Sequence, residues 1–227
     1  MNQTTVSYKG FRLSKLNDPQ FRHLWLLLFW PVNLALFFIA GHCIPIENCT
    51  PMHMFFDDLI PFNEWFLIPY VGWYFLIAGS LLWFLFKDVE RFKRLQTFIA
   101  ISQLTCSVIY FIWPTCHNLR PDFATLGRDN ILIDGVKFLY SIDTTSNACP
   151  SLHATIAIGI AIHCCLSKRV NLPWKIFVAV FSFLVCMSIT FVKQHSAVDF
   201  FGALAMTAAA QTAVWLIFRK KKAEVTL

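Results

Sequence analysis

Long apolar stretches alternate with short polar segments along the whole chain. The six stretches cover approximately residues 23–42, 65–86, 95–113, 150–166, 172–191 and 198–218. Each has roughly the 17–25 residues that a helix needs to cross the hydrocarbon core of a membrane, and each carries almost no charge in its interior. Because a helix satisfies its backbone hydrogen bonds within one segment, the pattern predicts an all-α fold, a six-helix transmembrane bundle.

The composition agrees with a membrane protein. Hydrophobic residues make up 57% of the 227 residues and charged residues 14%, whereas a soluble domain has about 45–50% apolar and about 25% charged residues. With a mean hydropathy of +0.57, these values exclude a disordered chain, a collagen-like repeat and an ordinary cytosolic enzyme. The length suits one bundle, so we expect a tail over 1–22, a six-helix membrane domain over 23–218 and a basic tail over 219–227.

The basic residues are unevenly placed and predict an orientation. The chain has 19 basic and 13 acidic residues, a net charge of +6. If the six stretches alternate across a membrane, fifteen Lys and Arg flank the side with both termini and four lie on the other side. Because cytoplasmic loops carry an excess of Lys and Arg, we expect a multi-pass protein of a plasma or inner membrane with both termini in the cytoplasm. We expect no cleaved signal peptide, and the basic tails are predicted to contact membrane lipids rather than nucleic acid.

Four cations lie on the predicted outer side, against this trend: Arg120, Arg128, Lys137 and Lys193. Three of them belong to the long segment 114–149, and long ordered loops are often functional. The cations predict an anionic ligand on this side. Ordinary exceptions to the charge trend are the alternative.

The eight cysteines include no C-x-x-C pair, which argues against a zinc or thioredoxin-like site. In an oxidising exterior, Cys43 could pair with Cys49, and Cys116 with Cys149. Free buried thiols are the alternative for the second pair.

Polar segments with chemical potential fall at the outer ends of predicted helices. His195 and Asp199 are spaced i, i+4 at the start of the last helix, so they share one face. The carboxylate can fix the ring tautomer and leave the other nitrogen as a nucleophile or base. A purely structural His–Asp pair is the alternative.

A second polar segment opens the fourth predicted helix. Ser151 and His153 follow Pro150 in its first turn, where free N–H groups form an anion site. A His beside bound phosphate can protonate the leaving oxygen, although a His near a membrane interface is often used only for packing. Arg120 can grip phosphate oxygens in bidentate fashion, and Lys193 can add a point charge.

These groups predict phosphoryl transfer without a metal, because they supply a nucleophile, an acid and cations for the developing charge. The sequence contains no Asp/Glu cluster suited to Mg²⁺. The spacing of His117, His153 and His195 does not favour zinc. We therefore predict neither a metal nor another cofactor.

The same residues carry a family resemblance. PSLH at 150–153 and the His195-x-x-x-Asp199 pair resemble two of the three signature motifs of the type 2 phosphatidic acid phosphatase superfamily, and Arg-Pro at 120–121 resembles the end of the first. The similarity covers about 113–202, and the six-helix layout extends it over most of the chain. It implies a phospho-His intermediate on His195, with Asp199 orienting that ring.

The resemblance implies further roles and also shows two departures. His153 would protonate the leaving group, while Arg120 and Ser151 would bind phosphate. The family has a Lys where this chain has Trp113, and Ser-Arg where it has Ser-Ile at 188–189. Two expected cations are therefore missing. Lys193 is the predicted substitute, with Arg128 or Lys137 as a second.

The predicted function is that of an integral membrane lipid phosphatase, a metal-independent phosphoric monoester or diphosphate hydrolase acting at the outer leaflet. Its partner is a lipid phosphate substrate such as phosphatidic acid, phosphatidylglycerol phosphate or a polyprenyl diphosphate. The chain also resembles inositol phosphorylceramide synthase-like proteins, so the first alternative is a lipid phosphotransferase with an alcohol acceptor. The second alternative is a non-catalytic membrane transporter or scaffold.

Overall fold

The computed structural model describes residues 5–43 and 48–224, and these residues are mostly helical. Short 3-10 helices occur at Leu13–Lys15, Arg22–Leu28, Glu64–Phe66 and Phe123–Thr125. The longer elements are α1 (Phe29–Cys43), α2 (Phe55–Leu59), α3 (Leu67–Lys87), α4 (Val89–Ile112), α5 (Ile131–Ile142), α6 (Leu152–Leu166), α7 (Leu172–Phe191) and α8 (Ala197–Glu224). Strands β1 (Thr50–Pro51) and β2 (Thr115–Cys116) form a parallel pair in which Thr50 is opposite Thr115.

Four helical segments are long and apolar enough to cross a membrane. They are Glu64–Lys87, Val89–Ile112, Leu172–Phe191 and Ala197–Arg219. The chain therefore has the helices of a membrane protein. The other two predicted stretches form shorter helices, α1 and α6, of 15 residues each.

Proline positions account for where these two shorter helices begin. The sequence pattern predicts a helix from residue 23, but Arg22–Leu28 is a 3-10 helix and α1 begins at Phe29. Pro31 thus falls in the first turn of α1, where its missing N–H costs no bond within the helix. Pro150 precedes Ser151, which is the N-cap of α6.

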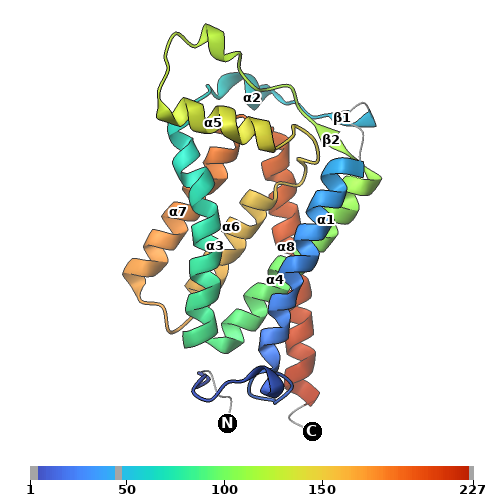
Figure 1. Cartoon of the computed structure of the whole chain (residues 1–227), viewed down its shortest axis with the longest axis vertical. Coiled ribbons are helices and arrows are strands. Elements are labelled where there is room, and N and C mark those ends of the chain that lie inside the picture. The colour runs from blue at the N-terminus through green and yellow to red at the C-terminus, as the bar shows by residue number, and fades with distance from the viewer. Residues whose placement is uncertain (1–4, 44–47, 225–227) are drawn as a thin grey trace.

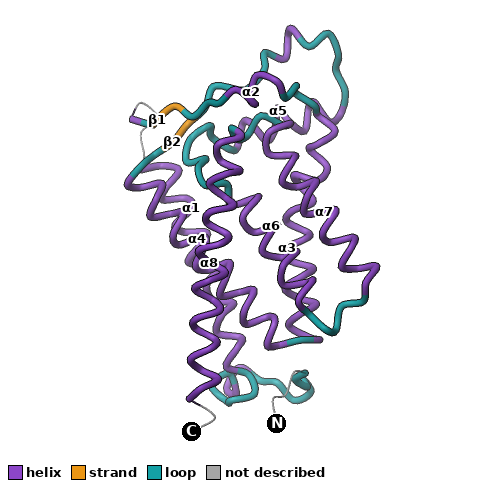
Figure 2. Tube along the Cα trace, turned by 180° about the vertical axis from the view of Figure 1, so that it is seen from behind, coloured by secondary structure: helices purple, strands orange, loops and turns teal. Residues whose placement is uncertain are grey.

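The bundle has two unlike ends (Figure 1). The N-terminal 3-10 helix and the end of α8 lie at one end. At the other end lie α2, α5, β1 and β2 together with the turn between α7 and α8; we call this the loop end. Figure 2 shows the same arrangement from behind, with the strand pair beside the ends of α1 and α4. All of the predicted site segments therefore fall at the loop end.

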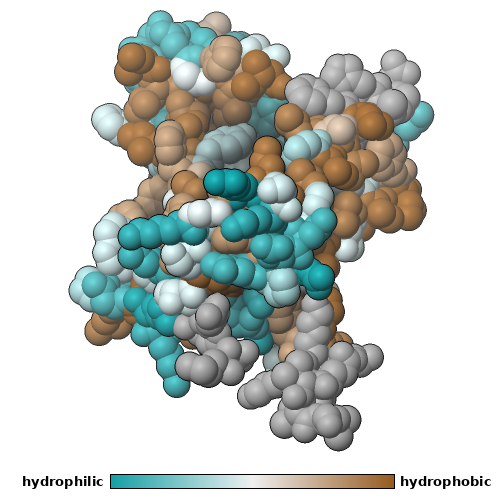
Figure 3. All heavy atoms as spheres, turned by 60° about the horizontal axis from the view of Figure 1, so that its bottom comes forward, coloured by the Kyte–Doolittle hydropathy of each residue, from teal (hydrophilic) through white to brown (hydrophobic). Residues whose placement is uncertain are grey.

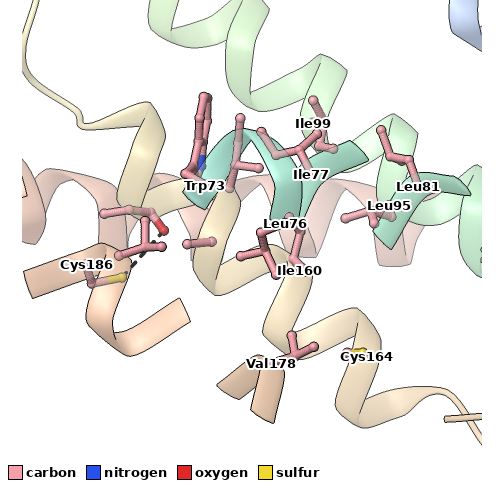
Figure 4. Close-up of a cluster of buried hydrophobic side chains, with 14 of the residues drawn as sticks. Trp73, Leu76, Ile77, Leu81, Leu95, Ile99, Ile160, Cys164, Val178 and Cys186 are labelled. Atoms are coloured by element: carbon pink, nitrogen blue, oxygen red, sulfur yellow. Dashed lines mark hydrogen bonds between the residues drawn. The ribbon is translucent and has the colours of Figure 1, made fainter. Parts of the chain in front are cut away.

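Helix α6 occupies the centre of the bundle and contacts α3, α4, α7 and α8. Its Ala154, Ile156, Ala157 and Ile160 are fully buried. Gly159 admits the ring of Phe98, since a Cβ at this position would overlap the ring atoms. Figure 4 shows Ile160 and Cys164 of α6 among side chains of α3, α4 and α7.

The flanks of the bundle are apolar, whereas hydrophilic atoms gather at the end opposite the loop end (Figure 3). Large apolar side chains are exposed on α3, α4 and α7, including Phe75, Ile112 and Phe183. Soluble monomers rarely expose contiguous apolar surface on this scale. The exposed flanks therefore fit contact with lipid.

The loop end corrects the predicted disulfides. Cys49 is bonded to Cys116, with 5.6 Å between their Cα atoms. The predicted pairs Cys43–Cys49 and Cys116–Cys149 are therefore wrong, because pairing of β1 with β2 brings the two loops together. Cys149 is a free buried thiol. The side chain of Cys43 lies outside the described part of the structure.

Candidate active site

The start of α8 holds the His–Asp pair that the sequence predicts: Asp199 lies in the first turn of α8, and His195 lies in the turn that precedes the helix rather than on the helix itself. His195 Nδ1 lies 3.1 Å from Asp199 Oδ2, and the carboxylate also accepts from the backbone N–H of Ser196 at 3.0 Å. Asp199 is fully buried and His195 is 9% exposed. Because a carboxylate accepts and does not donate, Nδ1 carries a proton, and in the neutral ring Nε2 keeps its lone pair.

The start of α6 packs directly against this pair. The Oγ atom of Ser151 lies 3.3 Å from His195 Nε2, and the Ser151 backbone N–H donates to the carbonyl oxygen of Asp199 at 3.2 Å. Ser151 also caps α6 by accepting from the N–H of Ala154 at 3.5 Å. The N–H groups of this first turn have no partner within the helix, so they point positive charge toward His195.

His153 sits between aromatic side chains of α3. Its ring centroid lies 4.3 Å from that of Tyr70, with the rings stacked, and 4.2 Å from that of Trp73. The centroid of His195 is 6.1 Å away. In the described part of the chain, His153 Nε2 is buried and has no hydrogen-bond partner. The two His rings thus face a common region from α6 and α8.

Arg120 reaches the same region through Gln194, the residue before His195. Its Nη2 donates to Gln194 Oε1 at 2.7 Å and to the carbonyl oxygen of Asp143 at 2.9 Å, while Nη1 donates to the carbonyl oxygen of Tyr140 at 3.1 Å. The guanidinium also stacks 4.1 Å over the Tyr140 ring. Burial lowers the pKa of Arg120 from its ordinary value. Arg120 thus lies next to His195 in the fold, with protein acceptors on both terminal nitrogens, and its phosphate role stays a prediction.

Lys193 does not have the contacts predicted for a phosphate-binding cation. Its ammonium donates to the carbonyl oxygens of Asp57 at 2.9 Å and Ile60 at 2.5 Å. The residue has φ of +53°, an uncommon backbone conformation for a side chain other than glycine. Burial lowers the pKa of Lys193. These bonds turn the ammonium toward α2 and the loop that follows it, and phosphate binding by Lys193 stays a prediction.

Arg128 is likewise engaged in a contact within the protein. It forms a bidentate pair with Glu64, with Nη2 to Oε2 at 2.8 Å and Nε to Oε1 at 3.1 Å. Asn130 donates to the same buried carboxylate at 3.0 Å. Lys137 contacts the exposed carboxylates of Asp129 and Asp134. The donors of Arg128 are thus used within the protein, and its phosphate role stays a prediction.

Three further residues belong to the site: His117, which the sequence offered only as a zinc ligand, and Tyr70 and Trp73, for which the sequence carried no signal. His117 Nε2 donates to the carbonyl oxygen of Gln194 at 2.7 Å, and its Nδ1 accepts from the N–H of Leu119 at 3.4 Å. Burial, and then the charge of His195, lowers the pKa of His117 to about 4, so its ring is neutral. Tyr70 and Trp73, which enclose His153, come from a helix about 80 residues earlier in the chain. Their partners are set by packing, not by any local spacing.

An acidic residue also borders the site. Gln194 Nε2 donates to Asp143 Oδ2 at 3.3 Å. Burial raises the pKa of Asp143, whereas the nearby His195 and Arg120 lower it. Gln194 thus connects Asp143, Arg120 and His117 beside the nucleophile candidate.

In the described residues, no group of three His, Cys, Asp or Glu side chains is arranged to hold a metal ion. The set weighed for zinc, His117, His153 and His195, does not form such a group there. Two of these rings have other contacts: His117 with Gln194 and Leu119, and His195 with Asp199 and Ser151. What the arrangement offers is an oriented imidazole, a second imidazole and a helix N-terminus.

Comparisons with known proteins add no further constraint, so the family resemblance depends on the motifs themselves and on the geometry around them. No protein-family model, no curated protein and no solved structure matches this chain.

Proposed function

We propose that the protein is a membrane lipid phosphatase of the type 2 phosphatidic acid phosphatase kind, acting through a phospho-His intermediate on His195. The observation that carries the proposal is the orientation of His195. Asp199 holds Nδ1, and Nε2 faces Ser151 at the positive end of α6. A nitrogen with a fixed lone pair beside an anion-binding helix end is suited to attack phosphorus.

The reaction has two steps in this geometry. Nε2 of His195 attacks phosphorus, the P–O bond to the lipid breaks, and protonated His153 gives its proton to the leaving oxygen. Water then attacks the phospho-His, with His153 taking its proton, so that inorganic phosphate leaves and both rings return to their starting states. The two ring centroids lie 6.1 Å apart, so both imidazoles belong to one site.

The charge of the transferred group needs donors in place before reaction. Ser151, the first-turn N–H groups of α6 and Arg120 are the donors that lie near His195. Lys193 and Arg128 are not included, because they contact Asp57, Ile60 and Glu64, whereas Arg120 contacts Gln194, the residue before His195. The proposal thus needs fewer cations than the family pattern contains.

The membrane setting supports a lipid substrate. Exposed apolar side chains cover the flanks of the bundle, and the site lies at one end of it, where a headgroup would sit. We place the loop end outside on the basis of the Lys and Arg distribution. In this proposal α1 and α6 complete a six-helix bundle, with α6 enclosed by its neighbours and α1 extended by the preceding 3-10 helix.

Purified protein in lipid nanodiscs tests the proposal. Phosphatidic acid, phosphatidylglycerol phosphate and a polyprenyl diphosphate are supplied separately, and inorganic phosphate is measured with and without EDTA. We expect release from at least one lipid, resistance to EDTA, and an acid-labile phosphate trapped on the peptide that contains His195. Absence of release and of phosphopeptide with all three substrates would reject the phosphatase.

Alcohol acceptors in the same assay separate the phosphatase from a transferase. A phosphatase gives free phosphate at a rate that added inositol or glycerol leaves unchanged. A product in which phosphate is joined to the alcohol would instead assign the phosphotransferase reaction to the same His195 intermediate.

A further inference from the structure

The short helix α2 buries an acidic side chain and exposes its large apolar ones, the reverse of an ordinary surface helix. Phe55, Phe56 and Leu59 are exposed by 69%, 48% and 60%, while the carboxylate residue Asp57 is only 4% exposed. Burial of a carboxylate is unfavourable unless donors surround it. The partners of Asp57 should therefore explain why this loop folds against the bundle.

Those partners lie in the turn that carries His195. Asp57 Oδ2 accepts from Ser196 Oγ at 2.5 Å, and Oδ1 accepts from the backbone N–H of Ala197, the first residue of α8, at 2.7 Å. The remaining donor is local, the N–H of Met54 at 2.8 Å. An acidic group at a helix N-terminus is stabilising, and this one comes from about 140 residues earlier in the chain.

Ser196 connects this carboxylate to the catalytic pair. Its side chain is bound to Asp57, while its backbone N–H donates to Asp199 Oδ2, the atom that also contacts His195. Movement of Ser196 would therefore move one of the donors that fix the Asp199 carboxylate. Ser196 is itself fully buried, so water is not available to replace the Asp57 bond.

The same loop grips the turn from its other side. Lys193 donates to the carbonyl oxygens of Asp57 and Ile60, and the N–H of Asn63 donates to the carbonyl oxygen of Phe191 at 3.0 Å. The Cys49–Cys116 disulfide fixes the beginning of this loop to β2. The turn from Phe191 to Ala197 is thus held at both ends by one loop.

We infer that Asp57 is a positioning residue for the phosphoryl-transfer reaction: through Ser196 it holds Asp199 and His195 in the geometry for attack. The inference rests on the proposed function. Asp57, in the loop between α1 and α3, would thus contribute to the chemical step by positioning His195. It would not bind the substrate.

The central test replaces Asp57 and its neighbour in turn. Asp57→Ala should lower kcat by roughly 10²-fold with little change in KM, because a small misplacement of reacting groups affects the chemical step. Asp57→Asn keeps an oxygen acceptor and should recover part of the loss. Asp58→Ala is the matched control and should have wild-type kcat, since Asp58 is 65% exposed and pairs only with the exposed His53 among its described contacts.

A second variant guards against simple misfolding of Asp57→Ala. Ser196→Ala removes the hydroxyl that binds Asp57 but keeps the backbone N–H groups that bind Asp199 and Asp57. This variant should therefore fold, and its kcat should fall by a smaller factor than that of Asp57→Ala. A KM that rises while kcat stays constant, in either variant, would overturn the positioning role.

An activity-independent measurement separates this inference from the proposed function. The rate at which diethyl pyrocarbonate modifies His195 is followed by peptide mass spectrometry, with hydrogen exchange measured over 195–199. Both rates should increase in Asp57→Asn and remain unchanged in Asp58→Ala. If the wild-type protein releases no phosphate from any lipid, the proposed function fails. If the rate of His195 modification in Asp57→Asn equals that of the wild type, the positioning role of Asp57 is rejected, whatever the outcome for phosphate release.

Discussion

The His195–Asp199 pair and the cations Arg128 and Lys193 all lie at the loop end, but their contacts have different effects. At the pair, Asp199 and Ser196 restrain one side of His195 and leave Nε2 directed to Ser151. Arg128, in the second long loop, places its donors on Glu64, and Lys193, in the turn before α8, places its donors on the carbonyl oxygens of Asp57 and Ile60. The first arrangement keeps a reactive atom available, whereas the second consumes the charge in holding the fold.

This difference shows why charge on a membrane face is a poor guide to ligand binding. A Lys or Arg that violates the positive-inside trend can be retained because a buried carboxylate or a loop carbonyl needs it. Glu64 is such a carboxylate, with three donor contacts from Arg128 and one from Asn130. Substitutions in the two regions should therefore affect different measured quantities.

The largest effect is expected at the nucleophile. His195→Ala should abolish both turnover and phospho-enzyme, because no other described ring nitrogen is oriented by a carboxylate in this turn. Asp199→Asn should keep the fold but slow phospho-enzyme formation by roughly 10³–10⁴-fold, as the tautomer is no longer fixed. Rapid chemical quench followed by detection of the phosphopeptide checks both variants. Phosphate trapped on His153 in the wild type would reverse the assignment.

His153 should show a loss that depends on the substrate. His153→Ala should lower turnover of a lipid phosphate by roughly 10²–10⁴-fold, the usual contribution of a general acid. A nitrophenyl phosphate has a leaving group that needs no proton, so its hydrolysis should be partly retained. Tyr70→Phe, which keeps the ring that stacks on His153, is the control. Equal losses with both substrates would contradict the acid role.

Removing the disulfide should lower the stability of the fold. The Cys49–Cys116 bond closes a separation of 67 residues. Its loss in Cys49→Ser with Cys116→Ser should lower the free energy of unfolding by about 2–4 kcal/mol. Thermal unfolding in nanodiscs measures this loss. In the wild-type protein, the number of free thiols should rise by two on reduction. Equal thiol counts would show that the bond is not formed.

The smallest effect on activity is expected at the loop cations. Arg128→Ala should lower Tm because it leaves Glu64 buried with Asn130 as its remaining side-chain donor among the described residues, yet kcat of the folded protein should stay near the wild-type value. Lys137→Met, at an exposed pair, should change neither Tm nor kcat measurably. A large rise in KM for either variant would restore the phosphate role that the contacts argue against.

The sequence by itself determined the features that depend on local spacing. Long apolar stretches specified the helices, and four of them are confirmed as segments able to cross a membrane. His195 and Asp199 are four residues apart and contact each other across the start of α8, and Ser151, which follows Pro150, is the N-cap of α6. These features involve residues close together in the chain, so the residue order is enough to predict them, although His195 lies before the helix and not on it.

Only the tertiary structure decided the contacts between distant segments. Lys193 meets Asp57 across 136 residues, and Arg128 meets Glu64 across 64. Cys49 is bonded to Cys116 instead of a cysteine nearer in the chain, and His153 packs against the rings of Tyr70 and Trp73 from α3. No residue spacing encodes such pairs, because they arise when the loops fold over the bundle and each buried charge must find a donor or acceptor within reach.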